Sequence, residues 1–447
     1  MKRKMFLGMS MVLIAGMVTA CSSQSNGSGA GSSSAPGSSA ASSPKAENVE
    51  LTWWTDSNAD MQDIYKQYKA DFEKANPNVK INIVAQPDDK IQERISIAVN
   101  TNALPDIQEG SIGWPLTYAK KGLLVPLDEI IQKNDFDPGV LNSLAVDKKS
   151  YMYPFNFTAS AMMVNRDLFK AKNAENLLPK DMGTWTYDQF KEAAKAVNEP
   201  SKQIYGFGTY AGDIGGDQGH HMFLWGFGAK TWADDNMTAV LNSPQGAEGL
   251  EYLIKMVEEG LTPPGTAGLK AGQVINEMFL QGKVAMTFGS IGNFSAFNKA
   301  WNEGSAKKFD VDLVPYPSKD GKSSNTVLFG SSYWVWNTKN EAKIKWSKEF
   351  VKFVNTKENM SKLTKLPSII VPLKSLAGSY DANSAQGKTL KLFQYAGNIG
   401  VAIPGYSETR AAFTPELQAA FTRKKTPQQA LDAWVTKANE IVKNASK

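Results

Sequence analysis

The chain contains few of the side chains on which most enzyme chemistry depends. Its 447 residues include one cysteine, Cys21, and two histidines, His220 and His221. Adjacent side chains diverge by about 100° on a helix or point to opposite faces of a strand, so these histidines are poorly placed to share one metal ion. The sequence also lacks a G-x-S-x-G motif, which excludes the strand-to-helix elbow of many serine hydrolases.

Charge of one sign and long apolar runs are also scarce. The chain has 49 basic and 44 acidic residues, and residues 1–20 contribute three of the basic ones and none of the acidic ones. The rest of the chain has 46 basic against 44 acidic residues, a net charge of +2, which is too balanced for a nucleic-acid-binding surface. Beyond residue 20, no apolar run approaches the roughly 20 residues that cross a bilayer. The composition indicates a soluble globular protein long enough for two domains.

The first 20 residues have the organisation of a bacterial signal peptide. Three basic residues precede an uncharged, largely apolar stretch over residues 5–18, which is too short for a mature transmembrane helix. The sequence VTAC at 18–21 resembles the lipobox of bacterial lipoproteins, whose cysteine is acylated and becomes the new N-terminus. We therefore expect a lipoprotein signal peptide at 1–20 and a lipidated (palmitate-bearing) Cys21. The alternative is an ordinary secretory signal with a chance cysteine.

A tether follows the predicted anchor. Residues 22–44 hold 11 serines, 4 glycines and 4 alanines, with no charge and no large apolar side chain. Such a segment cannot bury enough surface to offset its chain entropy. We predict a disordered Ser/Gly/Ala tether at 21–44, which would span roughly 25 Å as a Gly/Ser-type coil. Acylation of Cys21 would also leave the mature protein without a thiol nucleophile or a thiolate metal ligand.

From residue 45 onward the patterns alternate between strand and helix. The first five predicted elements are a strand at 49–56, a helix at 60–75, a strand at 79–84, a helix at 88–100 and a short strand within 104–111. This order predicts a parallel α/β sheet. Ligands of such sheets gather outside the carboxyl ends of the strands, which places residues 54–58 and 109–114 beside one crevice.

Later helices begin at recognisable capping residues. Thr186 and Gln189 form a capping-box pattern before an apolar stripe. Ser243 precedes Pro244, which is typical of an N-cap followed by proline at the first helical position. Thr426 begins the C-terminal helix in the same way.

The order of the segments resembles the extracellular solute-binding proteins of ABC sugar importers, the group that includes maltodextrin-binding proteins. The resemblance covers nearly the whole mature chain, and its specificity lies in the order and spacing of many weak matches. These include LTWWTD, FEKANPNVKINIV, TNALPDIQEGS, YMYPFNFTASAMMVNRDLFK, GTWTYDQFKEAAKAV, LQGKVAMTFGSIGNF and GSSYWVWNTKNEAKIKWSKEFVKFV.

The resemblance implies an α/β fold of the two-lobed, type II periplasmic-binding-protein kind. Each lobe would be a mostly parallel sheet flanked by helices, and a hinge would join the lobes. The implied N-terminal lobe comprises 45–157 and 311–357, and the C-terminal lobe comprises 158–310 and 358–447. The hinge strands would lie near PFNFTAS and KKFDVDLVP.

The resemblance also implies a function. The protein would be a non-enzymatic, monomeric receptor without a cofactor, which captures a sugar or oligosaccharide between its lobes and delivers it to the permease subunits of an ABC importer. It would be anchored to the outer face of the cytoplasmic membrane of a Gram-positive bacterium. Two alternatives stay open: a receptor for a polyol phosphate, peptide or polyamine, and a lipid-anchored polysaccharide hydrolase that uses a carboxylate pair.

Sugar chemistry selects the candidate site residues. Aromatic rings stack on the apolar faces of a sugar, while carboxylates, amides and arginine bond its hydroxyls. Asp56 has an alternative role as a helix cap, Trp54 as a core residue and Arg410 as a surface ion-pair partner. Asp213 and Asp217 lack the spacing of a calcium loop, so no metal is expected. The family's contact regions fall on Trp54, Asp56, Asn58, Glu109, Ser111, Trp114, Asn156, Asp213, Asp217, His220, Trp225, Ser290, Asn293, Ser332, Tyr333, Trp334, Tyr406, Glu408 and Arg410.

Overall fold

The computed structural model describes most of the chain beyond the predicted tether. The described residues are 47–56, 59–86, 91–136, 140–141, 145–146, 149–235, 237–367, 369–397, 399–401 and 403–446. The predicted signal peptide, Cys21, the tether and Asn58 lie outside them. No helix in these ranges has the length and apolar character that crossing a membrane requires. Residues Glu47–Lys447 belong to one compact unit.

A five-stranded sheet, here called the first sheet, has the strand order β2-β1-β3-β11-β6. Both β2 and β3 pair with β1 in parallel, as the sequence predicted, whereas β11 is antiparallel to β3 and to β6. The sheet is therefore mixed, because a strand from late in the sequence enters between two early ones. The strands are β1 (Val49–Thr55), β2 (Val79–Ala85), β3 (Ile107–Ser111), β6 (Tyr153–Ala159) and β11 (Leu328–Val335).

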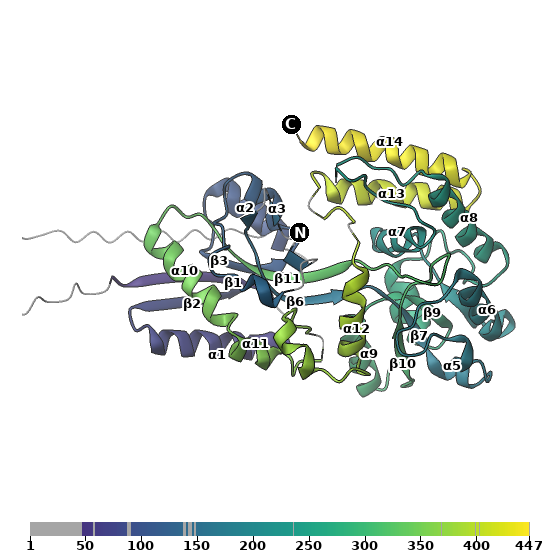
Figure 1. The fold of residues 1–447 in the computed structure, drawn as a ribbon, viewed down its shortest axis with the longest axis horizontal. Coiled ribbons are helices and arrows are strands. Elements are labelled where there is room, and N and C mark those ends of the chain that lie inside the picture. The colour runs from purple at the N-terminus through teal and green to yellow at the C-terminus, as the bar shows by residue number, and fades with distance from the viewer. Residues whose placement is uncertain are drawn as a thin grey trace, which may run out of the picture. The chain divides into compact units, whose positions relative to one another are not determined.

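Aromatic residues join the first sheet to its helices. Trp53 of β1 is fully buried, and its ring centroid lies 4.8 Å from that of Tyr65 and 5.0 Å from that of Phe350. In Figure 1, α1 lies below this sheet and α2 and α3 lie above it. The helices around the sheet are α1 (Ala59–Ala75), α2 (Ile91–Thr101), α3 (Pro115–Lys120), α10 (Glu341–Val354) and α11 (Lys357–Leu363).

A four-stranded second sheet has the order β10-β7-β9-β8, in which only β8 and β9 pair in parallel. Its strands are β7 (Ala161–Asn165), β8 (Tyr205–Gly208), β9 (Val284–Gly289) and β10 (Val311–Val314). The helices around it are α5 (Arg166–Lys170), α6 (Tyr187–Val197), α7 (Asp217–Trp225), α8 (Pro244–Glu258), α9 (Asn293–Asn302), α13 (Tyr406–Phe421) and α14 (Pro427–Ala445).

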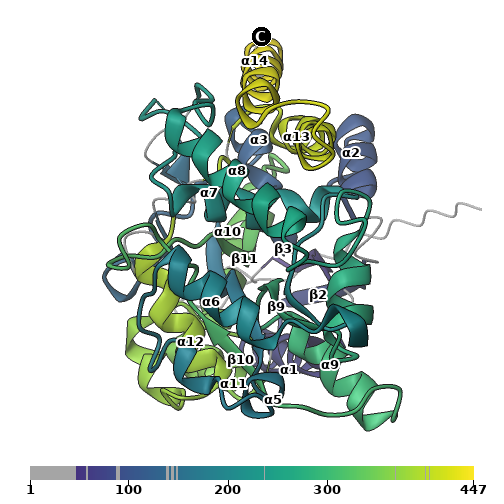
Figure 2. The same cartoon turned by 90° about the vertical axis from the view of Figure 1, so that its right-hand side faces the viewer.

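The remaining elements are short or shared. A π-helix, Gln273–Phe279, packs beside β9, and α12 (Ala385–Leu392) packs on β10 and on β6. A separate two-stranded pair is formed by β4 (Ala145–Val146) and β5 (Lys149–Ser150). The helices α13 and α14 pack against each other at the top of Figures 1 and 2.

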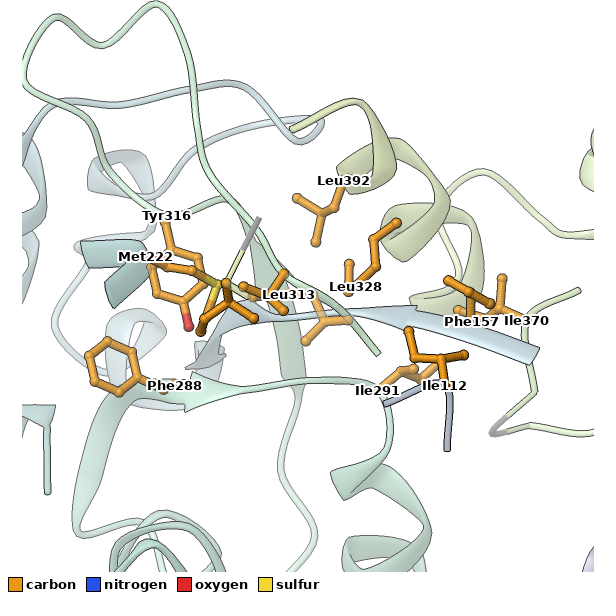
Figure 3. Close-up of a cluster of buried hydrophobic side chains, with 14 of the residues drawn as sticks. Ile112, Phe157, Met222, Phe288, Ile291, Leu313, Tyr316, Leu328, Ile370 and Leu392 are labelled. Atoms are coloured by element: carbon orange, nitrogen blue, oxygen red, sulfur yellow. The ribbon is translucent and has the colours of Figure 1, made fainter. Parts of the chain in front are cut away.

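Two segments connect the sheets. Ser160 links β6 of the first sheet to β7 of the second, and the chain returns between β10 and β11. Ser160 Oγ lies 2.9 Å from Tyr316 Oη, and Thr326 Oγ1 donates to the Ser160 carbonyl oxygen at 2.7 Å. Figure 3 shows apolar side chains, among them Leu313 and Leu328, gathered around this passage. The predicted hinge segments therefore lie against each other.

The sheet topology corrects the predicted lobe boundaries in detail. Val311–Val314 pairs with β7 and so belongs to the second sheet, although the prediction began a first-lobe segment at residue 311. Thr158 and Ala159 still belong to β6 of the first sheet, although the prediction ended that segment at 157. The residues at which the chain changes sheets therefore differ from the predicted lobe boundaries at 157/158 and 310/311.

The predicted helix caps are confirmed. Thr186 and Thr426 each form a complete capping box with the glutamine three residues later. Ser243 Oγ accepts a hydrogen bond from Gly246 N–H at 3.2 Å, directly before Pro244. Each such cap contributes about 1 kcal/mol to stability.

Candidate functional site

A cavity of about 1040 Å³ opens beyond the carboxyl end of β3. One wall follows β3 and includes Ser111 and Trp114, and the opposite wall includes Tyr406, Glu408 and Arg410 at the start of α13. Residues 328–330 at the beginning of β11 also line it. The volume lies near the upper end of the roughly 300–1,000 Å³ that small-molecule sites occupy.

A glycine seats the aromatic residue of the first wall. A Cβ atom at Gly110 would lie 2.8 Å from Trp114 Cζ3 and 3.1 Å from Trp334 Cη2. Only a residue without a side chain leaves room for the indole of Trp114 against β3 at this point. The half-buried Trp114 is thereby held where it lines the cavity.

The aromatic residue of the opposite wall is held by polar contacts. Gln218 Nε2 of α7 donates to Tyr406 Oη at 3.1 Å. The guanidinium carbon of Arg410, one helical turn along α13, lies 5.6 Å from the centroid of the Tyr406 ring. Burial raises the pKa of Tyr406 to about 12, so the phenol is neutral near pH 7 and offers both a ring face and a hydroxyl.

An ion pair lies behind this wall. Arg410 Nε donates to Asp217 Oδ2 at 2.6 Å, and Arg410 Nη2 donates to Asp217 Oδ1 at 2.8 Å. The Asp217 side chain is 1% exposed, whereas that of Arg410 is 24% exposed. Burial raises the pKa of the Asp217 carboxyl, and the two hydrogen bonds from Arg410 act in the opposite direction. The pair joins α7 to α13.

The cavity brings together a minority of the residues that the sequence nominated. Gln218 also lines the cavity, as do several residues that the sequence did not indicate. The missed residues include Tyr118, Lys120, Lys121, Gly330 and Val401. The end of β3 indicated that residues near α3 line a crevice. No local sequence pattern indicates the same for residues 328–330 or 401. The nominated residues on the cavity wall are Ser111, Trp114, Tyr406, Glu408 and Arg410.

A second group lies near the cavity but does not line it. Asp56 N–H donates to Glu109 Oε2 at 2.7 Å, so the ends of β1 and β3 meet as the sequence predicted. Glu109 itself is fully buried, and Trp54 is half-buried against the core. The buried Glu109 side chain therefore fixes the end of β1 through its hydrogen bond with Asp56.

Several nominated polar residues are engaged in local structure. Asn156 Oδ1 accepts from Ile370 N–H at 3.0 Å, and Asp213 Oδ1 accepts from Gly215 N–H at 3.0 Å. Asn293 Oδ1 accepts from Ser290 N–H, also at 3.0 Å. These side chains hold loops in place, and none of them reaches the cavity wall.

The remaining nominated residues are in the core. Tyr333 stacks on Phe155 with ring centroids 4.4 Å apart, and its strand neighbours Ser332 and Trp334 are fully buried. On α7, Trp225 Nε1 donates to Thr231 Oγ1 at 2.8 Å. The structure places these residues away from the cavity because β11 and α7 are covered on more than one side.

The two histidines are buried together on α7. His220 Nε2 lies 2.8 Å from Thr209 Oγ1, and His221 Nδ1 lies 2.9 Å from Thr231 Oγ1. Burial lowers the pKa of His220 to about 4 and that of His221 to about 3, so both rings are neutral near pH 7. Among the described residues, no three His, Cys, Asp or Glu side chains are grouped as a metal site.

Comparison with known proteins identifies the family. The family model described as bacterial extracellular solute-binding protein matches residues 58–361, which is more than half of the chain. The chain belongs to this family. The solute-binding protein is 24% identical over 416 residues to the galactooligosaccharide-binding protein of Bacillus subtilis (strain 168), which covers 91% of this chain and 93% of the relative. It is also 24% identical over 411 residues to the sn-glycerol-3-phosphate-binding periplasmic protein of Salmonella typhimurium, covering 84% and 88%.

Solved structures confirm the fold of the solute-binding protein. The cyclic alpha-maltosyl-1,6-maltose binding protein from Arthrobacter globiformis superposes with a TM-score of 0.74 at 22% identity, covering 88% of this chain and 99% of that one. The sugar-binding protein MalE from Xanthomonas citri gives a TM-score of 0.72 at 15% identity, covering 88% and 98%. The fold is that of a type II periplasmic binding protein, as the resemblance implied, but both sheets are mixed and neither is mostly parallel as expected.

Proposed function

We propose that this solute-binding protein captures a sugar or oligosaccharide in the cavity between β3 and α13 and delivers it to an ABC importer. The observation that carries the proposal is that one cavity combines aromatic residues, among them Trp114 and Tyr406, with the hydroxyl, amide and carboxylate of Ser111, Gln218 and Glu408. Aromatic rings suit the C–H faces of a sugar, and the polar groups suit its hydroxyls.

The relatives support a carbohydrate ligand. One is a galactooligosaccharide-binding protein, and one structural neighbour is a cyclo/maltodextrin-binding protein in complex with maltotetraose. A cavity of about 1040 Å³ leaves room for more than one sugar ring, which favours an oligosaccharide. The protein would act by binding alone, since capture and delivery require no bond to be made or broken.

The location follows from the N-terminal sequence. We propose that Cys21 is lipidated and that residues 21–44 tether the receptor to the outer face of the cytoplasmic membrane of a Gram-positive cell, beside its permease. Two or more acyl chains give stable anchoring because each buried CH₂ contributes about 0.8 kcal/mol. A monomer suffices for this role.

A thermal-shift screen of the mature protein against a carbohydrate library tests the proposal. A ligand at 100 times its Kd stabilises the folded state by about 2.7 kcal/mol, which raises the melting temperature measurably. A library in which no carbohydrate shifts the transition would contradict the proposal. Release of shorter sugars during incubation would instead support a polysaccharide hydrolase.

An anionic solute is the second candidate. The sn-glycerol-3-phosphate-binding relative favours it, as do Lys120 and Lys121, which line the cavity. Adding sn-glycerol 3-phosphate to the same screen separates the two candidates.

A further inference from the structure

We infer that Asp217 sets the charge selectivity of the cavity: by engaging the guanidinium of Arg410, it makes the site favour uncharged sugars over anionic ones. The inference rests on the proposed function, because it concerns the same cavity. Asp217 acts here as a positioning residue, since its side chain is 1% exposed and reaches the cavity only through Arg410.

The donors of Arg410 are largely used within the protein. Nε and Nη2 bond the two carboxylate oxygens of Asp217, and Nη2 also donates to the Ile214 carbonyl oxygen at 3.2 Å. A guanidinium can hold a phosphate or carboxylate through two parallel hydrogen bonds at its Nε/Nη2 edge or at its Nη1/Nη2 edge. Asp217 occupies the first edge, and the Ile214 carbonyl takes Nη2 of the second. Nη1 makes no hydrogen bond to any described residue, so one donor nitrogen is left for a ligand hydroxyl.

The ion pair also fixes the aromatic wall. Arg410 lies 5.6 Å over the Tyr406 ring, and Gln218, the residue after Asp217, donates to Tyr406 Oη at 3.1 Å. Two consecutive residues of α7 thus hold two residues of α13 that are one turn apart. A neutral sugar can stack on the immobilised Tyr406 ring and form hydrogen bonds with single groups of the wall. An anion gains little, because the charge of Arg410 is already neutralised by Asp217.

Other charges at the cavity are more exposed. Lys120, Lys121 and Glu408 line the cavity, but their side chains are open to solvent. Salt screens exposed charges over about 8 Å at physiological ionic strength, so the lysines attract anions weakly and without fixed geometry. The partly buried Arg410 is the cation on the wall that would bind an anion tightly if Asp217 did not hold it.

Phosphate binding to charge variants tests the inference. We expect Asp217→Asn to bind inorganic phosphate at least tenfold more tightly than the wild type in calorimetric titration, and the gain to shrink as salt is added. The double variant Asp217→Asn/Arg410→Gln should lose the gain, because it removes the released cation. The matched control Asp217→Asn/Lys121→Gln should keep it. An unchanged phosphate affinity in a folded Asp217→Asn protein overturns the inference.

The wild type provides a measurement that needs no variant of the ion pair. In calorimetric titration with dilute inorganic phosphate, where the general stabilising effect of phosphate salts does not enter, the wild type should show no saturable phosphate binding. Saturable phosphate binding that persists in the Lys120→Gln/Lys121→Gln variant would show that Arg410 is available to anions, and would overturn the inference. A different result would contradict the proposed function, namely that no neutral carbohydrate binds to the protein.

Discussion

The backbone N–H of Asp56 donates to Oε2 of Glu109 across 2.7 Å, and this hydrogen bond ties the end of β1 to β3. Tyr333 faces Glu109 in the register of β3 with β11, so the carboxylate lies beneath aromatic side chains. Because Glu109 is buried and holds the end of a strand, its main contribution is to the stability of the fold. Any effect on the ligand would follow from the position of the end of β1.

Glu109→Ala is therefore expected to lower the free energy of unfolding by about 2 kcal/mol, because it removes the buried acceptor of the Asp56 N–H and leaves that donor without its partner. Urea unfolding measures the change. The control is Glu50→Gln, an exposed position on β1, which should change the free energy of unfolding by less than about 0.5 kcal/mol. Equal stabilities of Glu109→Ala and the wild type would contradict the assignment of Glu109 to the fold.

Trp114→Ala is expected to weaken binding of the best carbohydrate by about threefold to tenfold, since aromatic stacking contributes roughly 0.5–1.5 kcal/mol. Gly110→Ala should weaken it similarly, because its Cβ would lie 2.8 Å from the Trp114 ring. The double variant should then show little further loss, as expected for coupled neighbours. Calorimetric titration measures all three. Gly378→Ala, where a Cβ meets nothing within 4 Å, is the control. Additive losses in the double variant would contradict the seating of Trp114 by Gly110.

The buried histidines predict a loss of stability in acid. The pKa of each is lowered from about 6.5 to about 4 for His220 and about 3 for His221, so the unfolded chain binds protons that the folded protein does not. Their contribution is complete above pH 6.5 and is lost as the pH falls toward the folded pKa values, by about 2 kcal/mol per histidine at pH 5. Urea unfolding at pH 8 and pH 5 measures this. His221→Gln should reduce the difference between the two pH values, and an unchanged difference would contradict the prediction.

Cys21→Ser is expected to release the receptor from the membrane fraction into the medium, because the thiol that would carry the lipid is gone. Cell fractionation followed by immunoblotting measures the distribution, and Ser22→Ala is the matched control that should stay with the membrane. A Cys21→Ser protein that remained in the membrane fraction would show that Cys21 is not the anchor.

Local patterns predicted much of the fold but less of the site. The capping boxes at Thr186 and Thr426 and the alternation over 49–111 depend on neighbours in sequence, so they were readable. The insertion of β11 between β3 and β6 depends on pairing between residues more than 150 positions apart, as at Phe329 and Thr158. The sequence offers no local pattern for such a contact.

The dependence on contacts between distant residues also explains why few of the site residues could be predicted. The position of Ser111 and Trp114 on the cavity wall was predictable because crevices form outside the carboxyl ends of parallel strands. Tyr333 and His220 were nominated because polar and aromatic residues in the family's contact regions suit a sugar. Their burial results from the helices and strands that pack around β11 and α7, and the chemistry of a side chain does not reveal this packing.

The position of β11 in the middle of the first sheet has a consequence for the order of events during synthesis and export. Until residue 335 has emerged, β3 and β6 have no strand to join them, and the first half of the chain holds two open sheet edges. The interleaved topology thus postpones folding until most of the polypeptide is available.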